Sequence, residues 1–141
     1  MAVATTQGDE EVLTFRLGGQ SYCVSIDNID EIVDYDQNLT KLPETRPHVE
    51  GVIDLRGRTT TIVDPKALLD IADDSGANHV VVFDSNAEDD GQVGWIVDEV
   101  RKVVGIESAD VDESVESRLA RGIVRNGSDD FLVWLNPEAF E

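Results

Sequence analysis

The stretch Gly51-Val-Ile-Asp-Leu-Arg-Gly-Arg-Thr-Thr-Thr-Ile-Val63 decides the fold of this chain. Residues 51–55 are mostly apolar and β-branched, and residues 59–63 are β-branched throughout. Two such runs on either side of a glycine predict two strands joined by a tight turn. Gly57 can supply the positive φ angle that the turn requires. The stretch therefore predicts a β-hairpin, with the cation Arg56 at its turn.

Short strand patterns occur on both sides of this hairpin. Residues 12–17 and 21–26 alternate between apolar and polar side chains around Gly18-Gly19, a two-residue hairpin signal. Further strands are predicted at residues 79–84, 93–97, 100–106, 122–125 and 131–135. About ten short strands at close spacing favour antiparallel barrels or a sandwich.

Helical patterns are few and short. Ile26, Ile29 and Val33 follow helical spacing after a possible N-cap at Asp27, which predicts one or two helical turns over residues 27–33. Residues 65–71 begin with a proline, which is acceptable in the first turn of a helix. Residues 108–121 are expected to be partly helical, and Asn136-Pro137 predicts a short C-terminal helix. This is too little helix for βαβ units.

The charge of the chain is extreme. Its 141 residues carry 30 acidic and 11 basic side chains, for a net charge of −19. Such a surface repels nucleic acid and anionic lipid. Because the acids are dispersed and lysine is scarce, the composition favours a protein adapted to molar salt, from a halophilic archaeon. An acidic mesophilic protein is the alternative.

Neither a membrane span nor an export signal is expected. No stretch approaches the ~20 apolar residues of a spanning helix. The acidic start, residues 1–11, lacks the basic and apolar regions of a signal peptide and is expected to be disordered. A cytoplasmic protein is therefore predicted, with the single cysteine, Cys23, buried in a strand.

The search for catalytic or metal-binding motifs finds little. The chain has no glycine-rich phosphate loop, and one cysteine with two histidines is too few for a structural zinc site. Asp110 and Asp112 resemble the start of a calcium loop, but Val115 and Arg121 stand where a glycine and a glutamate are needed. No metal, cofactor or catalytic residue is therefore predicted. Trp95 and Trp134 are assigned to the core, since a nucleic-acid-binding barrel needs a basic groove.

Five blocks of sequence carry a resemblance to a known family. The opening stretch resembles the G-V-x-N-L-R-G signature of the CheW-like domain. The other blocks are residues 13–26, residues 29–33, Leu42-Pro43 and residues 93–100, and they follow in the family's order. The resemblance covers the chain from about Val12 to the C-terminus.

The resemblance implies a fold and a function. The expected fold is all-β, with two small five-stranded SH3-like barrels side by side in one domain over residues 12–141. The expected function is that of a non-enzymatic adaptor, which couples the cytoplasmic tip of a chemoreceptor to the histidine kinase CheA. One barrel would dock on the kinase's own CheW-like regulatory domain, and a groove between the barrels would take the receptor. The alternatives are a CheW-like scaffold in another kinase pathway or a small-barrel enzyme that uses carboxylates.

The resemblance also nominates partner-binding residues. Arg56 matches the signature arginine, and its pairing partner is expected to be Glu31. We expect the guanidinium of Arg56 to be at least partly desolvated, since it ends an apolar strand. The remaining nominated residues are Ile29, Val49, Gly51, Gly57 and Val97. The chain departs from the family pattern at Asp54, Thr61, Pro65 and Lys66.

Overall fold

The computed structural model describes residues 10–35, 39–43, 45–71, 78–83, 92–107, 110–114, 117–126 and 130–140. Within these residues, regular structure is nearly all β: there are eleven strands and one five-residue α-helix. The all-β prediction is therefore confirmed. The chain divides into two compact units, one of Met1–Asp27 with Val100–Glu141 and the other of Asn28–Glu99.

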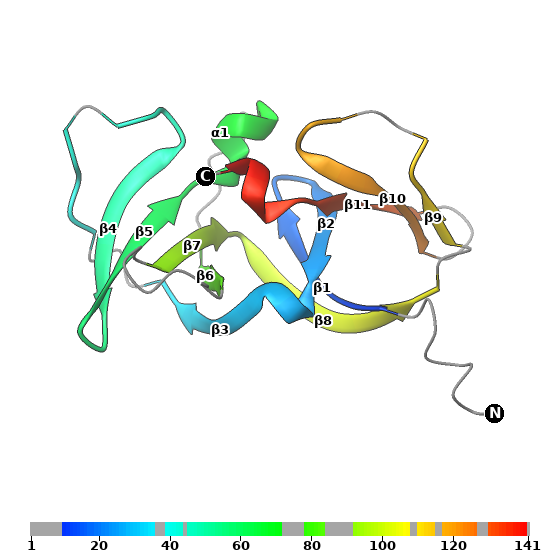
Figure 1. Cartoon of the computed structure of the whole chain (residues 1–141), viewed down its shortest axis with the longest axis horizontal. Helices are drawn as coiled ribbons and strands as arrows, with labels where there is room; N and C mark the ends of the chain where they lie inside the picture. Colours follow the sequence, from blue (N-terminus) through cyan, green and yellow to red (C-terminus); the bar gives the residue numbers. More distant parts are fainter. Residues whose placement is uncertain are drawn as a thin grey trace. The chain divides into compact units, whose positions relative to one another are not determined.

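The first unit contains a six-stranded sheet in the order β8-β1-β2-β11-β10-β9. Its strands are β1 (Glu10–Leu17), β2 (Gln20–Ser25), β8 (Glu99–Ile106), β9 (Val111–Asp112), β10 (Ala120–Asn126) and β11 (Asp130–Leu135) (Figure 1). β1 and β2 form the predicted hairpin around Gly18, whose φ is 64°. β2 then pairs in parallel with β11, so that the two ends of the chain share one sheet.

Trp134 is part of the buried core of the first unit. The buried cluster is made by Val12, Cys23, Ile106, Val124, Leu132 and Trp134. The guanidinium of Arg121 lies 4.0 Å from the centre of the Trp134 ring and covers it from solvent. Burial raises the pKa of the Cys23 thiol to about 12, and the nearby Arg121 lowers it only in part. The core assignments of Cys23 and Trp134 are therefore confirmed, and the thiol is unreactive near neutral pH.

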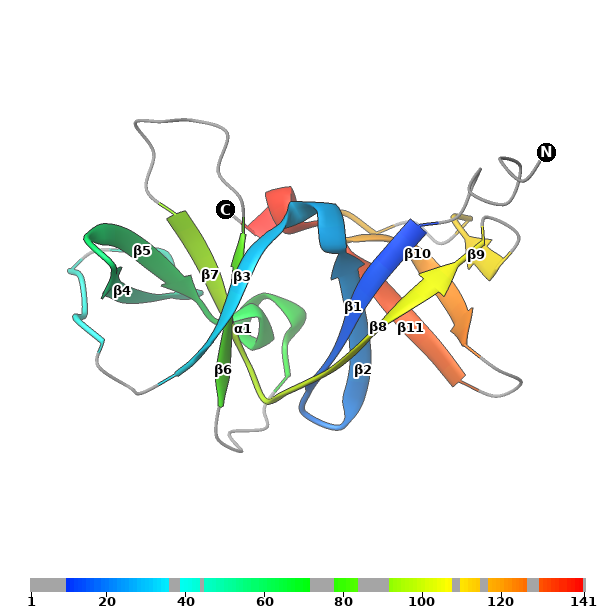
Figure 2. The same cartoon turned by 90° about the horizontal axis from the view of Figure 1, so that it is seen from below.

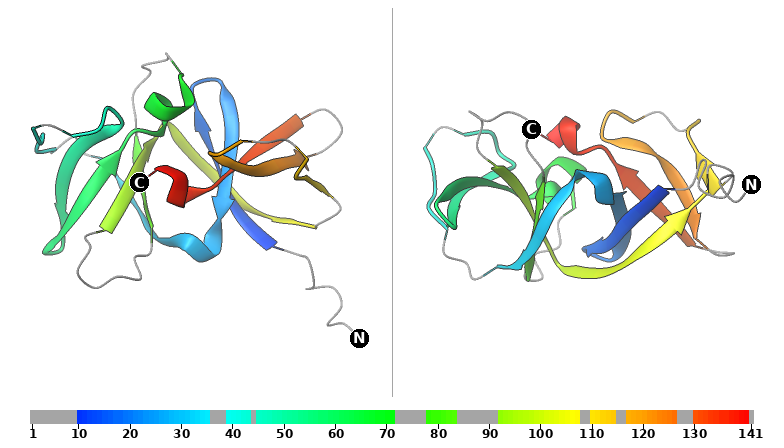
Figure 3. Two further views of the ribbon diagram at one scale, coloured as in Figure 1. Left: turned by 45° about the horizontal axis from the view of Figure 1, so that its top comes forward. Right: turned by 60° about the horizontal axis from the view of Figure 1, so that its bottom comes forward.

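The second unit contains a five-stranded sheet in the order β3-β6-β7-β5-β4. Its strands are β3 (Ile29–Asp34), β4 (Val49–Leu55), β5 (Arg58–Val63), β6 (His79–Phe83) and β7 (Gln92–Val97) (Figure 2). β5 and β7 are parallel, and the other neighbours are antiparallel. Figure 3 shows how strongly the β4–β5 hairpin curves. β3 and β4 are the two edges of this sheet, and both carry residues of the candidate site.

A second apolar cluster fills the second unit. Its buried members are Ile62, Val80, Val82 and Ile96, and half-buried Val33, Tyr35, Leu39, Ile53 and Leu55 pack against it. Trp95 is fully buried, with its ring 4.7 Å from that of Phe83 in an edge-on contact. The core assignment of Trp95 is therefore also confirmed.

The short helix α1 (Pro65–Leu69) forms because both of its ends are capped. The Asp64 carboxylate accepts a hydrogen bond from the backbone N–H of Lys66 at 3.0 Å, and Pro65 occupies the first turn. Asp70 ends the helix in a left-handed conformation with φ 59°. The helix predicted over residues 65–71 is confirmed, with its end two residues earlier.

The helix predicted over residues 27–33 is wrong. Only Ile26–Asn28 forms a 3₁₀ turn, and Ile29–Asp34 is strand β3. Burial alternates along β3 between half-buried and exposed residues, the two-residue period of a strand. Three of the six residues are β-branched, and pairing with β6 satisfies their backbone better than one isolated helical turn would.

Three further predictions need adjustment. In the described part of residues 108–121 there is no α-helix; the structure there is β9, a 3₁₀ residue at Asp110 and the start of β10. The C-terminal helix is a 3₁₀ turn over Pro137–Phe140. The first sheet has six strands instead of five, because β9 adds a two-residue edge.

The tail predicted for residues 1–11 lies mostly outside the described residues, and its last two residues belong to β1.

Candidate functional site

The turn between β4 and β5 places Arg56 in an unfavourable backbone conformation. Leu55 pairs with Arg58, so Arg56 and Gly57 alone form the turn, with φ angles of 51° and 85°. Two positive φ angles match the mirror-image turn that suits the twist of a hairpin. Glycine adopts such angles freely, whereas a residue with a Cβ loses about 1 kcal/mol. The structure therefore holds Arg56 in a conformation that Asn or Gly would adopt more readily.

Asp54 stabilises this turn. Its Oδ1 atom accepts a hydrogen bond from the backbone N–H of Gly57 at 2.9 Å. An asparagine at this position would offer the same acceptor oxygen. The departure from the family signature at Asp54 therefore leaves the turn intact.

Arg56 pairs with Glu31, as predicted. Nη2 of Arg56 donates to Oε2 of Glu31 in strand β3. The side chain of Arg56 is 71% exposed and that of Glu31 is 22% exposed. The predicted desolvation of the guanidinium is therefore wrong: the apolar run ends at Leu55, and the turn carries Arg56 out into solvent. A pair this exposed contributes little to stability.

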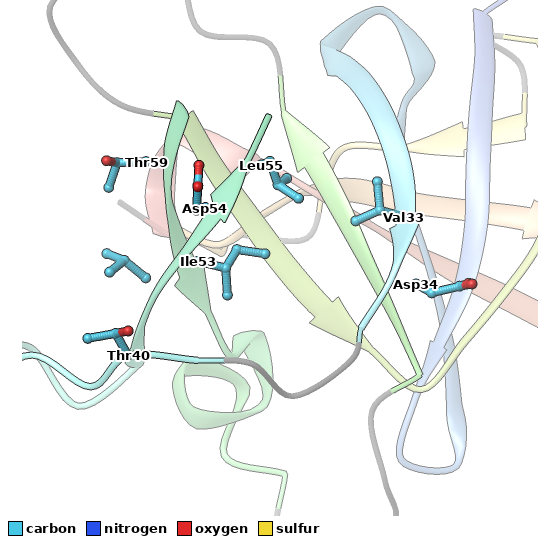
Figure 4. Close-up of a pocket in the computed structure, with 8 residues that line it drawn as sticks. Val33, Asp34, Thr40, Ile53, Asp54, Leu55 and Thr59 are labelled. Atoms are coloured by element: carbon cyan, nitrogen blue, oxygen red, sulfur yellow. The ribbon is translucent and has the colours of Figure 1, made fainter. Parts of the chain in front are cut away.

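The ion pair connects the two edges of the five-stranded sheet. Glu31 lies on edge strand β3, and Arg56 lies in the turn that follows edge strand β4. A hollow of about 520 Å³ lies between these edges (Figure 4). Val33 of β3 faces Ile53 and Leu55 of β4 across it. Its lining residues are Val33, Asp34, Thr40, Val52, Ile53, Asp54, Leu55 and Thr59.

Gly51 allows a second segment to approach β4 closely. Thr40 forms an isolated bridge with Val52, in which each backbone N–H donates to the other's carbonyl, at 2.9 and 2.8 Å. Gly51 has φ 153°, and a Cβ at this position would lie 2.2 Å from the Thr40 carbonyl oxygen. The nominated Gly51 therefore has a clear role in packing, and nothing in its surroundings requires a partner contact.

The other nominated residues lie at different depths. Ile29 and Val49 are half-buried at the starts of β3 and β4, and Gly57 is exposed in the turn. Val97, at the end of β7, is fully buried. In the isolated chain its side chain belongs to the core, and its nomination as a binding residue stays a prediction.

A buried ion pair was missed by the sequence analysis. Nζ of Lys66 lies 2.7 Å from Oδ1 of Asp98, and both side chains are nearly buried. Burial raises the pKa of the neighbouring Asp64, although the N–H bond from Lys66 and the charge of Lys66 lower it in part. Lys66 and Asp98 are 32 residues apart in the sequence, and no local pattern links them. The one signal in the sequence at this position was that Lys66 departs from the family pattern.

The described residues give no support for metal binding. Among them, no group of three or more His, Cys, Asp and Glu side chains could hold an ion. The Asp112 carboxylate accepts hydrogen bonds from the hydroxyl and backbone N–H of Ser114, at 2.6 and 2.9 Å. These bonds lower the pKa of Asp112.

The same described residues contain no helix that is long and apolar enough to cross a bilayer.

Comparison with known proteins identifies the family. Residues 11–140 match the CheW-like domain.

The chain belongs to the CheW-like domain family.

Several proteins named chemotaxis protein CheW are similar to this chain. That of Bacillus subtilis is 28% identical over 109 residues, which cover 76% of this chain and 67% of the relative. That of Thermotoga maritima is 33% identical over 103 residues, 72% of this chain and 66% of the relative. A probable CheW of Rhizobium etli is 31% identical over 125 residues, 84% of this chain and 79% of the relative.

A solved structure supports the fold. The scaffolding protein TtCheW of Thermoanaerobacter tengcongensis superposes with a TM-score of 0.77 at 24% identity, over 90% of this chain and 88% of that one. At this identity the likeness is evidence of fold. The CheW-like fold implied by the resemblance is therefore confirmed, and the turn that carries Arg56 is part of a CheW-like domain.

Proposed function

We propose that this chain is a chemotaxis adaptor, which couples the cytoplasmic tips of chemoreceptors to the histidine kinase CheA by protein–protein binding. The observation that carries the proposal is the match of residues 11–140 to the CheW-like domain, together with relatives named chemotaxis protein CheW. In this proposal the chain makes no bond and turns over no substrate, and it acts in the cytoplasm. CheA would bind it through the kinase's own CheW-like regulatory domain.

Arg56 is the best-supported contact residue. It occupies a left-handed position that costs about 1 kcal/mol, and an exposed pair with Glu31 recovers that much at most. Backbone strain that stability does not explain is typical of functional sites. The contact with Glu31 uses Nη2, while a guanidinium has five N–H donors in all. We infer that the remaining donors of Arg56 bind an acceptor on the receptor or the kinase.

The remaining parts of the proposal concern neighbours of Arg56 and the setting of the protein. Glu31, Ile29, Val49 and Gly57 lie at or near the surface and are proposed to shape the contact area around Arg56. A single CheW-like domain would span residues 12–141. The dispersed acidic charge supports a halophilic source, since about 1 M salt would screen it almost completely.

A binding experiment tests the function. The purified chain is immobilised and offered CheA and a receptor cytoplasmic fragment, separately and together, in molar KCl. We expect each partner to bind and Arg56→Ala to weaken at least one of them. Arg58→Ala is the matched control, because Arg58 is an exposed arginine two residues away at the start of β5. Absence of binding to both partners would overturn the adaptor proposal.

A further inference from the structure

A buried hydrogen-bonded chain crosses the five-stranded sheet next to the ion pair. Oγ1 of Thr60 donates to Oε1 of Gln92 at 3.2 Å, and Nε2 of Gln92 donates to Oδ2 of Asp30 at 3.1 Å. Thr60 is fully buried and Gln92 is 3% exposed, while Asp30 is exposed. Thr60 and Gln92 are register partners in β5 and β7, whereas β3 and β7 are not neighbours in the sheet. The chain therefore connects edge strand β3 to the middle of the sheet.

The direction of these hydrogen bonds is determined by Asp30. An ionised carboxylate only accepts, so the amide of Gln92 must turn its NH₂ group toward Asp30 and its oxygen toward the Thr60 hydroxyl. The bond to Asp30 is charge-assisted, and that class of hydrogen bond is stronger than a neutral one. A buried amide that is satisfied on both sides holds a single geometry.

Asp30 is also the extra residue of a β-bulge. Ile29 pairs with Phe83 and Glu31 pairs with Val82, which leaves Asp30 without an opposite residue in β6. A bulge bends its strand and changes the direction of the neighbouring side chains. The next residue after Asp30 is Glu31, the partner of Arg56. The side chain of Glu31 therefore projects from β3 directly after the bulge.

We propose that Thr60, Gln92 and Asp30 are positioning residues for the Arg56–Glu31 pair: they hold the β3 bulge in the one geometry that lets Glu31 orient the guanidinium of Arg56 for a partner. The proposal rests on the proposed adaptor function, since the partner is the receptor or kinase named there. Its structural half, the dependence of Arg56 on Asp30, stands independently of any partner.

The test compares Asp30→Ala with Asp30→Asn. Asparagine keeps an oxygen that accepts from Gln92, whereas alanine removes this acceptor at an exposed position of β3. We expect Asp30→Ala to weaken partner binding ~10-fold, as the loss of one hydrogen bond between a misplaced Arg56 and the partner would, and Asp30→Asn to weaken it less than ~3-fold. In ¹⁵N spectra of the full chain, the side-chain signals of Arg56 should lose their ion-paired shift in Asp30→Ala and keep it in Asp30→Asn.

A rescue experiment distinguishes positioning from general stability. Gln92→Glu sets two carboxylates against each other, and Gln92→Glu with Asp30→Asn restores a donor and an acceptor with their roles exchanged at the same net charge. We expect the double variant to recover the Arg56 signals that Gln92→Glu loses. If Gln92→Glu does not fold, the two Asp30 variants decide alone.

The outcomes separate this inference from the adaptor function. Identical Arg56 signals and affinities in Asp30→Ala and Asp30→Asn would overturn the inference while leaving the adaptor function standing. If the parent chain binds neither partner, the adaptor function fails, and the Arg56 signals still decide whether Asp30 positions the ion pair.

Discussion

Arg56 is exposed, so the role proposed for it in partner binding can be tested with little effect on stability. Replacement by alanine removes the ion pair but keeps a Cβ in the left-handed turn. We therefore expect Arg56→Ala to lower the free energy of unfolding by about 1 kcal/mol or less. Arg56→Asn also relieves the backbone, so its stability should equal or exceed that of the parent. Urea unfolding at a fixed KCl concentration measures both.

Charge reversal tests the pair itself. Arg56→Glu and Glu31→Arg each place like charges together, and the double variant restores opposite charges. The double variant should be more stable than the sum of the single changes predicts, while partner binding stays poor because the charge at the contact is inverted. Strictly additive effects would show that the two side chains do not interact.

Asp64 links helix α1 to pH. Burial raises its pKa in the folded chain above the ordinary value of 3.8, so the folded state holds its proton more tightly than the unfolded state. The contribution of Asp64 to stability therefore falls as the pH rises from 3.8 through the folded pKa. Asp64→Asn keeps the capping oxygen without the charge and should gain stability relative to the parent across that window.

The alanine variant is the control for Asp64. Asp64→Ala loses the cap and should cost about 1 kcal/mol at every pH at which the chain is folded. Thermal unfolding of the three proteins from pH 3 to pH 8 compares them. If Asp64→Asn is as destabilised as Asp64→Ala throughout, the cap depends on the carboxylate charge and the argument from burial is wrong.

At the scale of elements, β4 depends on its contact with the segment at Thr40. Gly51→Ala would place a Cβ against the Thr40 carbonyl oxygen, in backbone that cannot move far because Thr40 and Val52 exchange two hydrogen bonds. We expect a loss of about 2 kcal/mol or more in the free energy of unfolding, from overpacking and backbone strain combined.

Gly57→Ala separates these two contributions. Gly57 also has a positive φ, of 85°, but nothing lies within 4 Å of a Cβ placed there. Its replacement should therefore cost only the strain, about 1 kcal/mol. Equal losses in Gly51→Ala and Gly57→Ala would show that the segment at Thr40 moves aside easily. Both are measured by urea unfolding under one condition.

At the scale of the whole molecule, the net charge of −19 opposes folding in dilute buffer. The Debye length, the distance over which exposed charges still repel one another, is about 10 Å at 0.1 M salt and only about 3 Å at 1 M. We expect circular dichroism to show loss of structure, or a clearly lower Tm, as KCl falls from molar to millimolar concentrations. A chain that is equally heat-stable in dilute buffer would contradict the halophilic proposal.

Salt should affect binding in the same direction. When charges are screened, affinity depends on apolar contact more than on electrostatic steering. Binding to the regulatory domain of CheA should therefore persist or strengthen between 0.5 and 3 M KCl, measured by calorimetry with the chain folded throughout. A steep fall in affinity over this range would show that ion pairs dominate the interface.

Local patterns in the sequence were enough for much of the fold. The β4–β5 hairpin, the β1–β2 hairpin and helix α1 were all predicted, because alternation, glycine turns and a proline in the first turn of a helix act over a few residues. The family resemblance led in addition to the Arg56–Glu31 pair, which residue patterns alone would not have joined. The role of the nominated residues in binding stays a prediction.

Long-range packing decided the rest. Residues 29–34 carry apolar spacing that suits one helical turn, yet pairing with β6 makes them a strand. The hairpin pattern implied a desolvated Arg56, yet the turn exposes it. Lys66–Asp98, the Thr60–Gln92–Asp30 chain and the approach of Thr40 to Gly51 all join residues that are far apart in sequence. Such contacts depend on the sheet order, and their energies exist only once several strands have assembled around a common core.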